Sequence, residues 1–236
     1  MNITFNEDCM EGMKRYPDKY FDLAVVDPPY GGTKIEGVEY KGAVVGRFGG
    51  RFEKYDLGTE IKVDRTGRTW MKKFQKEIKS WDEAPGEEYF KELARVSKNQ
   101  IIWGGNYFDL PPTRCFLIWH KPNIADNFTM SNVEYAWTSF NDNAKIFSCI
   151  PQDKGRFHPT QKPIDLYRWI YKRYAKEGDK ILDTHMGSGS SRIAAYDMNL
   201  DYVGFEIYQP YYEKEEERYE AYTSELRMED LNAIGN

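Results

Sequence analysis

The regular alternation of short apolar, β-rich runs with helical patterns constrains this fold most. The runs span residues 3–6, 21–27, 100–103, 115–119, 133–138, 180–183 and 202–206, and helical spacing of apolar residues marks 85–97, 163–176, 188–199 and 209–231. Strands that alternate with helices form a mostly parallel sheet covered on both faces. No helical pattern separates 114–119 from 132–138. The prediction is an α/β, doubly wound, mostly parallel seven-stranded sheet with an antiparallel edge pair.

The totals fit one domain, residues 1–236, with a hydrophobic content of 40% and a charged content of 30%. No run approaches the roughly 18 apolar residues of a membrane span, and we expect no contact with a membrane. The cysteines Cys9, Cys115 and Cys149 form no CxxC pair, which favours a reducing cytoplasm. With only three histidines in the chain, a multi-histidine metal site is not expected.

Charge is unevenly distributed along the chain. Residues 31–80 carry twelve Lys/Arg, seven Asp/Glu and nine glycines. We interpret 31–80 as a basic, Gly-rich insertion at the mouth of a functional site, with a purely structural insertion as the alternative. Residues 196–236 carry three Lys/Arg against eleven Asp/Glu, and the acidic run 213–218 is expected on the outer face of the last helix.

The stretch AVVDPPYGG, residues 24–32, ends an apolar strand with Asp27, Pro28, Pro29 and Tyr30. Pro-Pro terminates a strand because proline has no N–H for the ladder. Alternatively, the turn is a rigid holder for a planar, nitrogen-bearing substrate. The two prolines would fix the direction of a carbonyl beside a carboxylate.

A second motif, ILDTHMGSGS over residues 181–190, combines an apolar strand, a Gly-x-Gly turn and the start of a helix. The third glycine of a dinucleotide fingerprint is replaced by Arg192, which argues against pyrophosphate binding. Glu206 ends the next strand, where an acid accepts hydrogen bonds from ribose hydroxyls. The combination indicates a nucleoside cofactor without a pyrophosphate.

A third motif, HPTQKP over residues 158–163, precedes a helix. Lys162 and the free N–H groups of a helix start would attract a carboxylate or a phosphate. A simple turn into the helix is the alternative for His158 and Pro159.

Together the three motifs resemble the DNA amino-methyltransferases, which methylate adenine N6 or cytosine N4, and their order resembles the permuted β group of that family. The resemblance covers most of the chain except 31–80 and implies a Rossmann-like methyltransferase fold that uses S-adenosylmethionine and no metal. NEDC, residues 6–9, is similar to the family's cofactor-adenine contact. The implied catalytic residues are Asp27, Pro28, Pro29 and Tyr30. The implied cofactor-binding residues are Asp8, Cys9, His158, Thr160, Gln161, Lys162, Asp183, Met186, Gly187, Ser188, Gly189, Ser190 and Glu206.

The resemblance implies double-stranded DNA as the substrate, with the target base flipped out because its amine is inaccessible in the duplex. Adenine N6 is the expected acceptor, and 31–80 the expected DNA-binding flap. None of the cysteines follows a proline, which disfavours the C5-cytosine chemistry that needs a nucleophilic cysteine. A homodimer and a restriction endonuclease partner both remain open.

Three alternatives fit the same residues. One is an N4-cytosine DNA methyltransferase, because Asp-Pro-Pro-Tyr is not exclusive to adenine enzymes. Another is a non-catalytic S-adenosylmethionine-binding or DNA-binding module, although both Asp27 and Tyr30 are present. A third is a methylase of RNA or of protein glutamine, whose members more often carry Asn at the first motif position.

Overall fold

The structure is a computed structural model that describes residues 1–31, 82–125, 131–151 and 155–234. Except for Gly31, the insertion predicted at 31–80 lies outside the described residues, and so does its expected role as a DNA-binding flap. None of the described helices is long and apolar enough to cross a membrane.

The described residues form an eight-stranded sheet with the order β1-β8-β7-β2-β3-β5-β4-β6. Its strands are β1 (Asn2–Phe5), β2 (Phe21–Val26), β3 (Ser97–Trp103), β4 (Phe116–His120), β5 (Val133–Thr138), β6 (Lys145–Ser148), β7 (Lys180–Asp183) and β8 (Asp201–Phe205). The five neighbouring strands β1, β8, β7, β2 and β3 are parallel to one another. The α/β, doubly wound class is confirmed, but the sheet has one strand more than the seven predicted.

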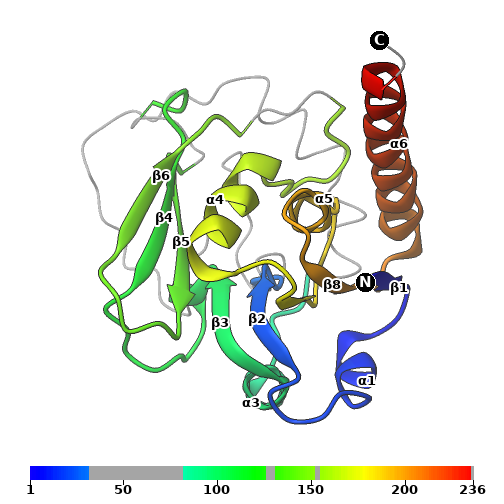
Figure 1. Cartoon of the computed structure of the whole chain (residues 1–236). Coiled ribbons are helices and arrows are strands. Elements are labelled where there is room, and N and C mark those ends of the chain that lie inside the picture. The colour runs from blue at the N-terminus through cyan, green and yellow to red at the C-terminus, as the bar shows by residue number, and fades with distance from the viewer. Residues whose placement is uncertain (32–81, 126–130, 152–154, 235–236) are drawn as a thin grey trace.

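Helices cover both faces of the sheet (Figure 1). They are α1 (Cys9–Met13), α3 (Glu87–Val96), α4 (Ile164–Tyr174), α5 (Ser190–Asp197), α6 (Gln209–Ile234) and the 3₁₀ turn η1 (Gly105–Tyr107). One core contains α4 and α5 residues such as Leu166 and Ala194 against Leu23 and Ile101 of the sheet. The other contains α1 and α3 residues against Ala24 and Val26. Strand β2 is buried on both faces, as its continuous apolar run predicts.

The antiparallel pair predicted from 114–119 and 132–138 is confirmed as β4 and β5, with Leu117 opposite Ala136. Its expected place at the edge is wrong, because β6 adds to β4 in parallel and forms the edge. The sequence gives β6 only four residues, with two exposed and two half-buried side chains, so no clear apolar run marks it.

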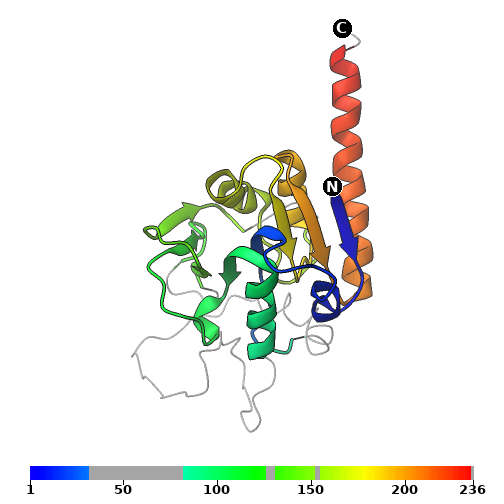
Figure 2. The same cartoon turned by 60° about the horizontal axis from the view of Figure 1, so that its bottom comes forward.

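Helix α6 corrects a prediction. Glu215, within the acidic run expected on the outer face, is completely buried. It receives a hydrogen bond of 2.8 Å from Arg192 on α5, and Arg192 also bonds Glu216 at 2.7 Å. Glu213, Lys214 and Glu217 of the run are exposed as predicted, but Glu215 faces inward because Arg192 supplies its carboxylate with a buried cation. Beyond this anchor, α6 extends past the rest of the chain (Figures 1 and 2).

Candidate active site

The carboxyl ends of β8, β7 and β2 place three acids along one edge of the sheet. Asp183 is the last residue of β7, Glu206 directly follows β8 and Asp27 directly follows β2. Because these strands are adjacent and parallel, their carboxyl ends meet at the same edge, which is where ligands bind in open α/β sheets.

Asp27 is held from two sides. Its Oδ1 accepts a hydrogen bond of 2.9 Å from the Tyr30 hydroxyl, and its Oδ2 accepts one from the Lys162 ammonium. The Asp27 side chain is 14% exposed and that of Lys162 is 3% exposed. The carboxylate is therefore oriented by two side chains and still reaches the surface of the site.

The Lys162 ammonium continues into a chain of buried charges. Its Nζ lies 3.3 Å from Glu134 Oε2 and 5.2 Å from the centre of the Trp103 ring. The other oxygen of Glu134 accepts a hydrogen bond from Lys121. Burial by itself would raise the pKa of Glu134, but Lys162 and Lys121 together lower it to about 2. Burial opposes the charge of Lys162, yet Asp27 and Glu134 raise its pKa.

Tyr30 stacks on Tyr107 with ring centroids 4.6 Å apart and an interplanar angle of 23°. Gly104 makes this position available: its φ is 65°, and a Cβ there would lie 2.1 Å from the Tyr30 ring. Burial and the neighbouring Asp27 raise the pKa of Tyr30 well above its usual value, so its hydroxyl remains a donor. Tyr30 thus belongs to an aromatic wall beside the Asp27 carboxylate.

The Gly-x-Gly turn follows β7 and is buried throughout from Met186 to Ser190. Asp183 accepts hydrogen bonds from the His185 N–H at 3.1 Å and from the Ser191 hydroxyl. Burial raises the pKa of Asp183 to about 6, against the opposing effect of these donors. Gly189 has a φ of 71°, and a Cβ there would lie 2.2 Å from Glu215. The turn is therefore tightly packed beneath α6.

Glu206 fastens the turn to the next strand. Its Oε2 accepts a hydrogen bond of 3.0 Å from the Gly187 N–H, and its Oε1 accepts one of 2.9 Å from Tyr208. Burial raises the pKa of Glu206 to about 7, although both backbone donors favour the charged form. A carboxylate has about four acceptor positions, so Glu206 retains two for a ligand.

The HPTQKP segment lies between the Gly-x-Gly turn and Asp27, with His158 beside Gly187 and Lys162 bonded to Asp27. The buried His158 ring packs edge-on against Tyr211 at 4.3 Å and lies beside Gly187, whose Cβ would be 3.2 Å away. Burial lowers the pKa of His158 to about 3. Thr160 is exposed, and its N–H lies 3.4 Å from His158 Nδ1. Gln161 accepts a hydrogen bond of 3.3 Å from the Phe157 N–H.

Predicted cofactor residues therefore fall into two groups. His158 lies against the Gly-x-Gly turn, whereas the Lys162 ammonium lies on Asp27. Arg218 of α6 supports the turn with hydrogen bonds of 2.7 Å to the Ser188 carbonyl and 2.9 Å to the Ser190 hydroxyl.

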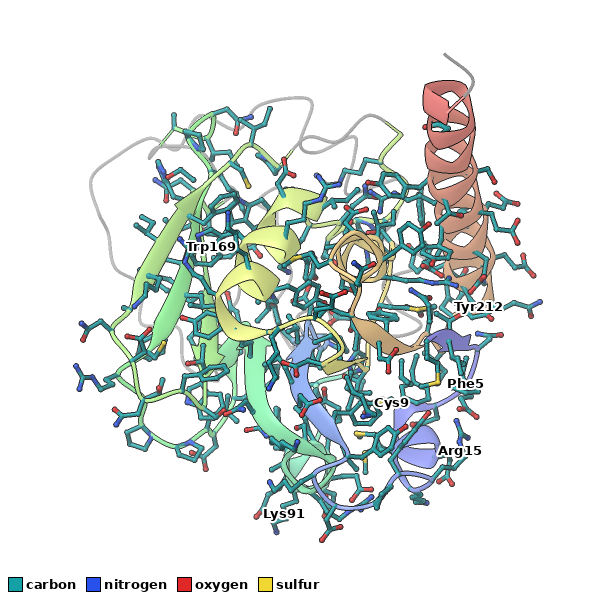
Figure 3. The ribbon with its side chains drawn as sticks, viewed as in Figure 1. Phe5, Cys9, Arg15, Lys91, Trp169 and Tyr212 are labelled. Atoms are coloured by element: carbon teal, nitrogen blue, oxygen red, sulfur yellow. The ribbon has the colours of Figure 1, made fainter. Side chains whose placement is uncertain are left out.

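Asp8 caps α1, and its Oδ1 accepts a hydrogen bond of 2.7 Å from the Met10 N–H. Cys9 is half-buried against the second core, where burial and the nearby Asp8 raise its thiol pKa to about 12. Phe5 stacks on Phe205 at 5.5 Å, and Arg15 lies 4.7 Å over Phe5 (Figure 3). These contacts hold α1 beside the ends of β1 and β8.

Sequence reasoning missed Glu134 and Lys121. Glu134 alternates with Ala136 and Thr138 along β5, and both of those residues are buried. A charged residue on the buried face of a strand requires a partner, so the period of two contained a usable signal. Among the described residues, no group of three or more His, Cys, Asp or Glu side chains is arranged to hold a metal.

Comparison with known proteins gives consistent matches. A family model described as DNA methylase matches residues 61–217. The Type II methyltransferase M2.MboI of Moraxella bovis is 24% identical over 258 residues, which cover 95% of this chain and 90% of that protein. The Type II methyltransferase M.HinfI of Haemophilus influenzae is 23% identical over 259 residues, which cover 92% of this chain and 68% of that protein.

Solved structures share the fold. The complex of M1.HpyAVI with SAM superposes with a TM-score of 0.56 at 16% identity and covers 92% of this chain and 98% of that one. The cytosine-N4-specific PvuII DNA methyltransferase gives a TM-score of 0.53 at 12% identity, and the match covers 88% of this chain and 83% of that one.

Proposed function

Because this chain belongs to the N6/N4 family of DNA methylases, we propose that it transfers a methyl group from S-adenosylmethionine to the exocyclic amine of a flipped base in double-stranded DNA, most specifically adenine N6. The observation that carries this proposal is Asp27, held at the end of β2 between the Tyr30 hydroxyl and the Lys162 ammonium. That arrangement presents a fixed carboxylate within the Asp-Pro-Pro-Tyr stretch, whose resemblance to the family's catalytic motif supports the proposal.

The cofactor half of the site fits S-adenosylmethionine by its chemistry. Two acceptor positions on Glu206 suit the two ribose hydroxyls. Asp8, at the start of α1, suits the adenine edge, and the buried turn from Asp183 to Ser190 brings backbone close to the ligand. The sulfonium of S-adenosylmethionine supplies an electrophilic methyl group. Its presence in the solved M1.HpyAVI complex, which shares this fold, supports the choice.

The base half supplies acceptors for the amine. An exocyclic amine is a weak nucleophile because its lone pair is delocalised into the ring. The Asp27 carboxylate and the Pro28 carbonyl would accept hydrogen bonds from its two N–H groups, so the nitrogen would become pyramidal as its lone pair forms the new N–C bond. The C–S bond to the methyl group would break at the same time, S-adenosylhomocysteine would leave as the thioether, and the surplus proton on nitrogen would pass to solvent by way of Asp27. Tyr30 and Tyr107 provide an aromatic wall for the flipped base. Proximity of amine and methyl group contributes a further large part of the rate.

Asp27 favours adenine N6, since among the DNA amino-methyltransferases that the sequence resembles, a serine at this position usually marks the cytosine enzymes. N4-cytosine is the second candidate, supported by the likeness to the cytosine-N4-specific PvuII structure. A non-catalytic role is less consistent with a hydrogen-bonded Asp27–Tyr30 pair.

The test is to express the chain in a host without DNA methylation, digest the DNA to nucleosides and analyse them by mass spectrometry. We expect N6-methyladenine, and Asp27→Ala should remove it. N4-methylcytosine would assign the second candidate. No methylated nucleoside from a folded protein that binds S-adenosylmethionine would refute methyl transfer to DNA. Single-molecule sequencing of the same DNA gives the recognition sequence.

A further inference from the structure

Four charges, the buried Lys162 and Lys121 and the half-buried Asp27 and Glu134, form a continuous chain that begins at the carboxylate of the base half. Asp27 bonds Lys162, Lys162 bonds Glu134, and Glu134 bonds Lys121. The Lys162 and Lys121 side chains are only 3% and 5% exposed, and the ammonium of Lys121 lies 4.7 Å over the Trp119 ring. The chain joins β2, β5, the end of β4 and the segment before α4.

The signs of the charges alternate along this chain, and their sum is zero. Burying an ion is costly unless a partner compensates it, so each member depends on its neighbour. On its Asp27 side, Lys162 donates to Oδ2, while Oδ1 of the same carboxylate receives the Tyr30 hydroxyl. Removing any single member leaves the chain with an unbalanced charge.

We propose that Lys162 is a positioning residue of the base half, which fixes the orientation of the Asp27 carboxylate and supplies the cation opposite it, and that Glu134 and Lys121 hold Lys162 in place for this task. The inference rests on the proposed methyl transfer and deepens it. It assigns Lys162 to the acceptor amine through Asp27, whereas the sequence resemblance assigned Lys162 to the cofactor.

Replacing Lys162 would change the electrostatic surroundings of Asp27. If Lys162 were replaced by an uncharged residue, Asp27 and Glu134 would face the same buried space without a cation. Two carboxylates in such a space share a proton at a higher pH than a single one does. A protonated Asp27 is a poorer acceptor, so the variant would lose activity mainly on the acidic side of its pH profile.

Other titratable or charged groups near Asp27 and Lys162 must be held constant in the test. Those that interact electrostatically with a member of this chain are Tyr30, Tyr89, Tyr107, Arg156, His158, Tyr167 and Asp183. The same groups are present in every variant below, so differences between variants report the four charges alone.

The experiment measures single-turnover methyl transfer to unmethylated genomic DNA from pH 4.5 to 8.5, with S-adenosylmethionine kept saturating at every pH so that Glu206 does not shape the profile. S-adenosylmethionine affinity is measured by calorimetry. For Lys162→Met we expect the acidic limb of the pH–rate profile, where the rate falls as the pH is lowered, to shift to higher pH by at least about one unit. At pH values below that limb the rate should be about tenfold lower than in wild type. Cofactor affinity should stay within about twofold of wild type. The double variant Lys162→Met/Glu134→Gln should move the limb back, since only one carboxylate remains.

Lys91→Met is the matched control, because Lys91 lies on α3 with a side chain that is 69% exposed (Figure 3). It should match wild type at every pH. An equal loss for Lys162→Met at all pH values, or a loss of cofactor affinity with an unmoved limb, would overturn the assignment. A double variant no closer to wild type than Lys162→Met would also overturn it.

If Lys162→Met does not fold, as judged by circular dichroism, Lys121→Met decides the question. Without Lys121, Glu134 interacts more strongly with Lys162 and weakens the contact of Lys162 with Asp27. We therefore expect the acidic limb to shift to higher pH by less than in Lys162→Met. Glu134→Gln should give no such shift. An unmoved limb in Lys121→Met then contradicts the proposal. Failure of the proposed function has a separate signature, since wild type itself would then transfer no methyl group to DNA.

Discussion

The two halves of the site treat buried carboxylates in opposite ways. In the base half, Asp27 and Glu134 are bound by the ammonium groups of Lys162 and Lys121. In the cofactor half, Asp183 and Glu206 accept hydrogen bonds from N–H and hydroxyl groups, and neither forms an ion pair within the described residues.

The pKa values follow this difference. Two cations lower the pKa of Glu134 to about 2 despite burial, whereas burial raises the pKa of Asp183 to about 6 and that of Glu206 to about 7. The four charges of the proposed base half sum to zero, which suits an uncharged base. The cofactor half holds carboxylates without a cation, which suits a ligand that brings its own positive charge, as a sulfonium does.

Asp27 gives the largest expected effect. Asp27→Ala should lower the single-turnover methyl-transfer rate by about a hundredfold or more, because it removes an acceptor aimed at the amine. Cofactor affinity, measured by calorimetry, should be nearly unchanged because Asp27 lies in the base half. Asp27→Asn, which keeps the shape and removes the charge, should also be strongly impaired. Full activity in either variant would contradict the assigned role.

Asp183 tests the cofactor half through stability. Its raised pKa means that the cost of ionising it in the folded state is absent below about pH 3.8 and complete above about pH 6. Relative to Asp183→Asn, the wild-type free energy of unfolding should therefore fall by about 2 kcal/mol between pH 4 and pH 7. Urea denaturation of both proteins at several pH values measures this difference. A constant difference would remove the contrast between the two halves.

Glu206 separates cofactor binding from chemistry. Glu206→Ala should weaken S-adenosylmethionine binding at least about tenfold, or about 1.4 kcal/mol. Wild-type affinity should also decline as the pH falls through about 7, because protonation removes acceptor capacity, and Glu206→Gln should lose that pH dependence. Glu213→Ala is the control, since Glu213 is exposed on α6. Unchanged affinity in Glu206→Ala would remove Glu206 from the site.

The smallest effect concerns the Tyr30 hydroxyl. Tyr30→Phe keeps the stack on Tyr107 and loses one hydrogen bond to Asp27. Since Lys162 still holds the carboxylate, the rate should fall less than about tenfold. Tyr30→Ala, which also removes the aromatic wall, should be much slower. Equal losses in both variants would show that the hydroxyl, and not the ring, carries the role of Tyr30.

Much of the fold was predictable because its signals are local. Strand β2 is a continuous apolar run, and α4 presents Leu166, Tyr167, Ile170 and Tyr171 on one buried face. Strand β6 was missed because it has four residues without an apolar run, and its pairing with β4 is a tertiary contact. Glu215 was misplaced for a similar reason, since its partner Arg192 lies on another helix.

The sequence by itself determined the strand-ending acids Asp27 and Glu206, the Gly-x-Gly turn and the family resemblance, because each is encoded in contiguous residues. Only the tertiary structure decided that Lys162 reaches Asp27, 135 positions away, and that Glu134 and Lys121 extend the chain of charges. The physical reason is that the ions packed around a buried ionisable group determine its orientation and its protonation state. Those neighbours come from separate strands, which only the folded sheet brings together.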